Sequence, residues 1–289
     1  MVSRYSEWIL KFKWLVVLLS VVWVMAMGYG AQYLSFTNDY RVFFSKENPQ
    51  LLAFENLQDT YTKNDNVMLV LVPEDGNVFS ENTLKAVLWL TEQAWQTPFS
   101  TRVDSLSNYQ HTFAEGDDLM VQDLVFADDE LNQDRLQQIR DIAINEPLLV
   151  NRLVSPSGNV TGINITIDLK GVDLTTENPL VVTFIRNLET EFKQQFSGID
   201  IRTTGIIMMN NAFPEASQYD MQHLVPIMFL VFIIVLFFWV KGLSGTITTL
   251  FVIIFSIVGA MGLAGWMGIA LTPPSFSAIM IIPTMSIAH

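Results

Sequence analysis

The chain has 289 residues, of which 50% are hydrophobic and 16% are charged, and its formal net charge is −13. An average soluble domain has about 25% charged residues, so the composition indicates that part of the chain lies in lipid. The absence of cysteine excludes disulfides and thiolate sites, and the acidic balance argues against a nucleic-acid partner, which needs clusters of lysine and arginine.

The charged residues are concentrated between residues 37 and 223, which contain 28 of the 29 acids and 12 of the 16 bases, a net charge of −16. Residues 1–36 contain one acid and three bases, and Lys241 is the single charged residue in 224–289. We therefore expect a water-exposed domain over 37–223, with membrane segments in 1–36 and 224–289.

In chain order, the first predicted element is the uncharged run over residues 14–34, which is long enough to cross a hydrocarbon core of about 30 Å. A signal peptide has an apolar core of only about 7 to 15 residues, so we predict an uncleaved spanning helix. Asn48 and Pro49 then mark the cap and first position of an amphipathic helix that extends to Tyr61.

The acid-rich middle alternates predicted strands and helices. The predicted strands lie at 66–76, near 101–109, at 158–169 and at 200–205, and the predicted helices at 80–96, 130–145 and 179–196. Two strand-helix-strand rounds favour an α+β fold of the ferredoxin-like, split βαβ type.

Two acidic runs, over residues 115–123 and 127–130, lack the ligand spacing and turn glycine of a calcium loop, so we interpret them as solvated loops. His111, His223 and His289 lack metal-ligand spacing. Phosphate-binding, nucleophile-elbow and zinc-protease motifs are also missing from the sequence. We therefore expect no metal, no cofactor and no enzymatic activity.

Residues 224–240 and 247–271 are the second and third predicted spans, and the short linker between them requires an antiparallel helical hairpin. Lys241 in this linker and the basic N-terminal flank place both on the cytoplasmic side by the positive-inside rule. The acidic domain is then extracytoplasmic. Residues 276–288 begin a fourth helix too short to complete a crossing, so we expect a chain cut from a longer polypeptide, with a re-entrant segment as the alternative.

Two candidate functional features lie in these last helices. The third predicted span contains four glycines spaced three residues apart, and small residues let helix backbones approach closely in lipid, which predicts a helix-packing site. These glycines are Gly259, Gly262, Gly265 and Gly268. His289 is an ionisable side chain within a predicted span, and it is therefore the candidate proton-coupling residue. The alternative is that it lies near the end of the helix or packs against a polar group.

Residues 43–72 and 268–289, together with the order of one span, a large α+β domain and further spans, resemble the N-terminal part of a resistance-nodulation-division exporter of the MMPL-like branch. The resemblance implies a bacterial inner-membrane transporter built from two such halves, with a porter-type extracytoplasmic domain. It also implies proton-driven export of lipids or other hydrophobic molecules. Relatives carry an aspartate after a small residue where this sequence has Ala288 and His289, so the resemblance leaves proton coupling at this position open.

Two alternatives come from other classes of protein. The first is a permease of the MacB or lipoprotein-release type, in which a separate ATPase supplies the energy, and the second is a nontransporting membrane sensor or anchor. For the exporter, the expected partners are membrane lipid, a hydrophobic substrate and the remaining helices of the transporter, and an oligomer is an open alternative.

Overall fold

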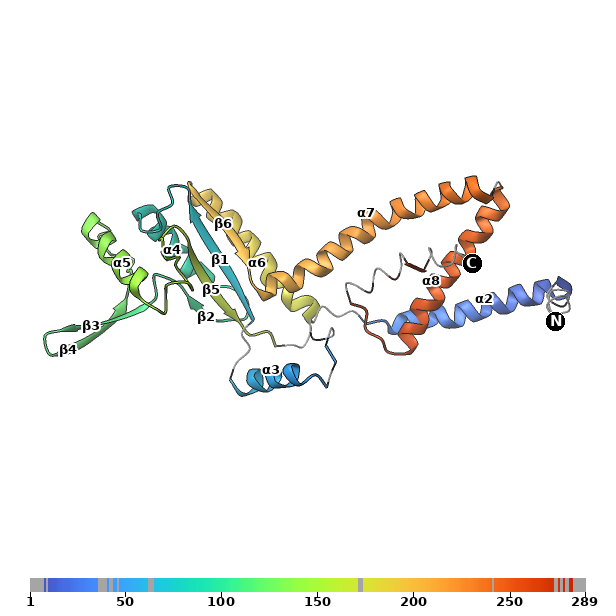
Figure 1. The fold of residues 1–289 in the computed structure, drawn as a ribbon, viewed down its shortest axis with the longest axis horizontal. Helices are drawn as coiled ribbons and strands as arrows, with labels where there is room; N and C mark the ends of the chain where they lie inside the picture. The colour runs from blue at the N-terminus through green and yellow to red at the C-terminus, as the bar shows by residue number, and fades with distance from the viewer. Residues whose placement is uncertain are drawn as a thin grey trace. The chain divides into compact units, whose positions relative to one another are not determined.

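The computed structural model of the chain describes residues 8, 10–35, 41, 44–45, 47–61, 65–170, 174–240, 242–272, 275, 278 and 281–282 (Figure 1). The chain forms two compact units. The helical unit comprises Met1–Asp39 and Phe213–His289, and the α/β unit comprises Tyr40–Ala212.

The helical unit is built from long apolar helices. Helix α2 spans Lys13–Tyr29 and continues as a 3-10 turn, η1, over Gly30–Tyr33. Helix α7 spans Ile206–Val240, so the boundary between the two units falls within it, and α8 spans Leu243–Trp266. Among the described residues, three segments are long and apolar enough to cross a membrane, with mean hydropathies of 2.0, 2.5 and 2.3: Lys13–Tyr33, Ile206–Trp239 and Leu243–Trp266.

These three helices leave most of their apolar side chains exposed within the chain. Leu230, Ile234 and Phe238 of α7, for example, are 59%, 48% and 73% exposed. Soluble proteins rarely expose apolar surface on this scale, so lipid is the solvent that suits these helices. Helix α7 begins well before the predicted start of the second span, because its first half continues the helix through polar residues.

A four-stranded antiparallel sheet forms the centre of the α/β unit, and its strand order is β2-β5-β1-β6. The strands are β1 over Asp65–Pro73, β2 over Ser100–Asp104, β5 over Thr161–Ile167 and β6 over Ile199–Thr204. Helix α4, Glu81–Ala94, joins β1 to β2, and α6, Leu174–Gln195, joins β5 to β6. If the four strands are counted in chain order, they lie in the sheet in the order 2-3-1-4. Two strand-helix-strand rounds in this order make the ferredoxin-like, split βαβ arrangement that the sequence predicts.

The core lies between one face of this sheet and helices α4 and α6. Val67, Leu69 and Leu71 alternate along β1 and are fully buried, as the two-residue period of a half-covered strand requires. The helices contribute stripes of buried side chains to the same core, among them Leu84, Val87, Leu90, Val181, Ile185 and Phe192. The start of α4 is fixed by Ser80, whose Oγ accepts the Thr83 amide at 3.2 Å.

Two further helices of the α/β unit are also capped. Helix α3 spans Pro49–Thr60, and the Asn48 side chain accepts hydrogen bonds from the second and third helical amides, which confirms the predicted cap. Helix α5 spans Gln133–Asn145, and Asn132 caps it through the Arg135 amide at 3.0 Å.

The prediction of a solvated loop over residues 115–123 is wrong. Strand β3, Gln110–Glu115, and strand β4, Asp118–Asp123, form a β-hairpin with a two-residue loop. The hairpin extends away from the four-stranded sheet (Figure 1). Gly116 adopts a φ of +65° in the turn. The hairpin escaped detection because Leu119, Met120 and Val121 are consecutive and so lack the alternation typical of a strand.

Helix α8 ends earlier than predicted, and Gly268 lies outside it. Met267 is the C-cap, and Gly268 follows with a φ of +66°. The Gly268 amide donates to the Gly265 carbonyl at 3.0 Å, and the Ile269 amide donates to the Ala264 carbonyl at 3.0 Å. This pair of bonds is a Schellman motif, in which a left-handed glycine ends the helix. The prediction that Gly268 is a residue of the third helix is therefore wrong.

Candidate functional site

Helices α2 and α8 lie side by side (Figure 1), and glycines stand where they are nearest to each other. A Cβ atom added at Gly262 would overlap the Met27 carbonyl oxygen and come within 2.9 Å of the Gly28 Cα atom. A Cβ added at Gly265 would overlap the Gly30 carbonyl oxygen. Because the obstructing atoms belong to the backbone, a larger side chain at either position would force the two helices apart.

The contact is reciprocal, since the first helix also presents glycines. A Cβ at Gly30 would overlap the Gly262 carbonyl oxygen and the Trp266 ring, and a Cβ at Gly28 would lie 2.7 Å from Val258 Cγ1. The sequence signals these two positions only as an isolated Gly-Tyr-Gly triplet. Sequence reasoning missed them because the partner of a small residue is set by tertiary packing.

Trp266 adds a polar contact beside the glycines. The Gly30 amide donates to the Met27 carbonyl as α2 tightens into the 3-10 turn, and Trp266 Nε1 donates to the Ala26 carbonyl oxygen at 3.2 Å. The carbonyl of Ala26 is the one that Gly30 would bond in a continuing α-helix. Trp266 therefore donates to a carbonyl that has lost its α-helical partner.

Two tyrosines surround the same tryptophan. The Tyr33 and Tyr29 ring centroids lie 5.2 Å and 6.3 Å from that of Trp266. Tryptophan and tyrosine favour the membrane interface, where an apolar ring and a polar atom are both accommodated. This end of the α2–α8 contact therefore has the composition of an interfacial belt.

The four glycines singled out in the sequence do not share one environment. Gly262 and Gly265 lie in the contact with α2 and η1, whereas a Cβ at Gly259 would meet nothing within 4 Å. Gly268 follows the end of α8, and a Cβ added at Gly268 would also meet nothing within 4 Å. The candidate proton-coupling residue, His289, and the linker residue Lys241 fall outside the described residues.

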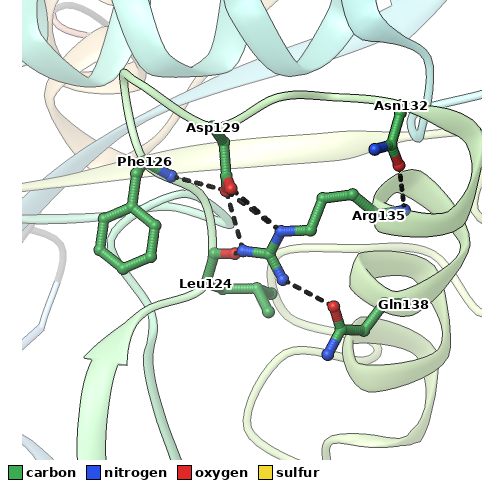
Figure 2. A network of polar contacts seen from close by, with 6 residues as sticks. All are labelled: Leu124, Phe126, Asp129, Asn132, Arg135 and Gln138. Atoms are coloured by element: carbon green, nitrogen blue, oxygen red, sulfur yellow. Dashed lines mark hydrogen bonds and ion pairs between the residues drawn. The ribbon is translucent and has the colours of Figure 1, made fainter.

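A separate polar network fixes the start of α5 in the α/β unit (Figure 2). Arg135 Nη2 lies 2.8 Å from Asp129 Oδ2 and donates to the Leu124 carbonyl at 2.8 Å, while its Nη1 donates to Gln138 at 3.1 Å. Burial acts to raise the pKa of the Asp129 carboxyl, but hydrogen bonds from Arg135 and from the Phe126 amide outweigh it, so this pKa lies below its usual value. Asp129, one of the three acids in the 127–130 run, thus has a structural partner.

In the part of the chain that the structure describes, no three histidine, aspartate or glutamate side chains come together as a metal-binding group would.

Comparison with known proteins adds one match. A family model described as the MMPL family matches residues 65–289, which run from β1 through α7 and α8 and cover more than half of the chain. None of the curated proteins compared with the chain matches it.

Proposed function

The chain belongs to the MMPL family of membrane transporters of the resistance-nodulation-division type, and on this premise we propose that it exports lipids or other hydrophobic molecules in exchange for protons. The observation that carries the proposal is the match over residues 65–289, because this range includes both the ferredoxin-like sheet and the apolar helices that follow it. A transporter, rather than an enzyme, is the function class of this family.

We propose that the chain lies in the bacterial inner membrane with its N-terminus in the cytoplasm and the α/β unit in the periplasm, where it acts as a porter domain. Lys11 and Lys13 at the start of α2, and Lys241 between α7 and α8, support this orientation by the positive-inside rule. Trp14 follows Lys13 near the start of α2, and Trp239 lies near the end of α7, two residues before Lys241. Tyr33 and Trp266 lie at the other ends of the first and third spans, an arrangement that suits two interfacial belts.

In this proposal the α2–α8 contact is a fixed part of the moving bundle. The close approach at Gly262 and Gly265 holds the first and third spans together through backbone contacts. Alternating access in secondary transporters is largely the rocking of one rigid bundle against another. A bundle joined by backbone contact suits such a movement, because it transmits force without repacking side chains.

The remaining partners are also proposals. The family resemblance implies two such halves, so we expect the chain to work with further membrane helices or with a second copy, together with membrane lipid and a hydrophobic cargo. We propose His289 as the residue that binds and releases the coupling proton, since an ionisable side chain within a span is costly unless it has a function.

Everted membrane vesicles from cells that produce the chain would test this function. Uptake of a fluorescent lipid analogue into the vesicles should depend on the proton gradient and stop when a protonophore collapses it. The His289→Gln variant should lose uptake, and His289→Asp should restore part of it, because aspartate also carries a proton. Uptake that survives the protonophore but requires ATP hydrolysis would instead identify a permease driven by a separate ATPase.

A further inference from the structure

The face of the central sheet that points away from the buried core carries a small pocket. Met68 and Val70 of β1 lie on this face, since they alternate with the buried Leu69 and Leu71. Gly162 of β5 pairs directly with Val70 and forms part of the same surface. A Cβ at Gly162 would overlap the Met68 Cε atom, so the glycine leaves room that the methionine tip partly fills.

The pocket has a volume of about 280 Å³ and is mainly apolar. The side chains that give it this character are Met68, Val70, Leu153, Pro156 and Val160, and Arg152 also lines it. Ligand sites commonly occupy about 300–1,000 Å³, so this pocket fits a segment of one alkyl chain rather than a two-chain lipid.

A tight loop forms the pocket wall. The carbonyl oxygen of buried Leu149 accepts the amides of Arg152, Leu153 and Val154 at 2.8–3.1 Å. The Leu153 carbonyl in turn accepts the Gly162 amide at 2.8 Å, which joins the loop to β5. Because these bonds fix its backbone, the wall is organised before any ligand arrives.

Arg152 is the cationic residue of this wall. Its side chain is exposed and has no hydrogen bond or ion pair within the described residues. By contrast, Arg102 is paired with Asp104 at 2.7 Å and Arg202 with Asp200 at 2.8 Å. A guanidinium with no acid beside it among the described residues attracts an anion locally, even in a region with a net charge of −16, and its fork geometry suits carboxylate or phosphate.

We propose that this pocket binds a single-chain amphiphile with an anionic head group, with the alkyl chain against Met68, Val70 and Val160 and the head group on Arg152. A guanidinium that has no partner among the described residues and an apolar pocket beside it match the two ends of such a molecule. The inference rests on the proposed function, because it names a class of cargo that the α/β unit handles.

Photolabelling of the full chain in nanodiscs of zwitterionic lipid tests the site. The probes are a palmitic acid with a diazirine on its chain, a lysophosphatidic acid with the same chain, and the methyl ester of the acid. Adducts are located by peptide mass spectrometry. We expect one or both anionic probes to label the peptides that contain residues 66–72 and 151–162, and we expect the uncharged ester to label them weakly.

Three variants define the contributions of charge and shape. Arg152→Gln should reduce labelling by the anionic probe about tenfold, as expected for loss of a charge-assisted hydrogen bond. Val160→Phe should reduce labelling by filling the pocket, and its fold is checked by circular dichroism. Arg102→Gln, on the same sheet but paired with an acid, should label as the native chain does.

Three results would overturn the inference: adducts confined to the spanning helices, equal labelling by ester and acid, or an Arg152→Gln variant that labels normally. Labelling needs no proton gradient, so its outcome is independent of the vesicle uptake assay. Transport without labelling at this pocket would reject the site alone, whereas labelling without transport would reject the proposed function and leave the site standing.

Discussion

Replacement of Gly262 by alanine tests whether the contact between α2 and α8 depends on backbone approach. The added methyl group would overlap the Met27 carbonyl oxygen and lie 2.9 Å from the Gly28 Cα atom. Neither atom belongs to a flexible side chain, so the helices must separate. Gly262→Ala should therefore weaken the helical unit even though alanine favours the helix more than glycine does.

The magnitude follows from three contributions. Overpacking of a close contact costs about 1–3 kcal/mol. Separation of the helices also weakens the bond from Trp266 to Ala26, and interhelical hydrogen bonds in membranes contribute about 0.6 kcal/mol on average. The higher helix propensity of alanine offsets about 0.5–1 kcal/mol. The net loss is about 2 kcal/mol, or roughly a thirtyfold change in the folding equilibrium.

The measurement is unfolding of the full chain in mixed micelles with a rising fraction of sodium dodecyl sulfate, followed by circular dichroism. Gly259→Ala is the matched control, because Gly259 lies on the same helix as Gly262 but a Cβ added there meets nothing within 4 Å. The control should be as stable as the native chain or slightly more stable. Equal stability of the Gly262→Ala and Gly259→Ala variants would refute the reasoning.

Three smaller perturbations test other contacts. Trp266→Phe keeps the ring but removes the donor to the Ala26 carbonyl, and it should cost about 0.6 kcal/mol in the same micelle titration. The pKa of Asp129 is lowered in the folded state, so the ionised carboxylate stabilises the fold above the ordinary carboxyl pKa, and this contribution is lost as pH falls through the lowered value. In the Asp129→Asn variant, the unfolding temperature should therefore fall less steeply as the pH is lowered into the acid range. Ser80→Ala removes the cap of α4 and should destabilise the α/β unit by about 1 kcal/mol in urea, whereas an unchanged midpoint would exclude the capping role.

The elements that the sequence predicts best are those with a local physical signal. The charge-free runs predict the membrane helices because length and hydropathy are properties of the segment itself. The Ser80 and Asn48 caps mark helix starts for the same reason, since a cap bonds to amides two or three residues away.

The features that the sequence does not predict depend on partners distant in the chain. The proximity of Gly30 to Gly262 and the bond from Trp266 to the Ala26 carbonyl exist only once α2 and α8 are side by side. The sequence places the end of α8 too far along the chain, because the residues after Gly268 are as apolar as the helix and only the left-handed glycine marks the stop.

The placement of the acidic α/β unit outside the inner membrane is the claim on which the proposed function depends, and cysteine accessibility tests it most directly. The chain has no cysteine, so single variants report without background. We predict that a membrane-impermeant maleimide applied to intact spheroplasts will label Glu92→Cys on the exposed side of α4, and will label Ser244→Cys at the start of α8 only after the membrane is permeabilised. Labelling of Ser244→Cys from outside, with Glu92→Cys protected until permeabilisation, would contradict the proposed orientation and the export function built on it.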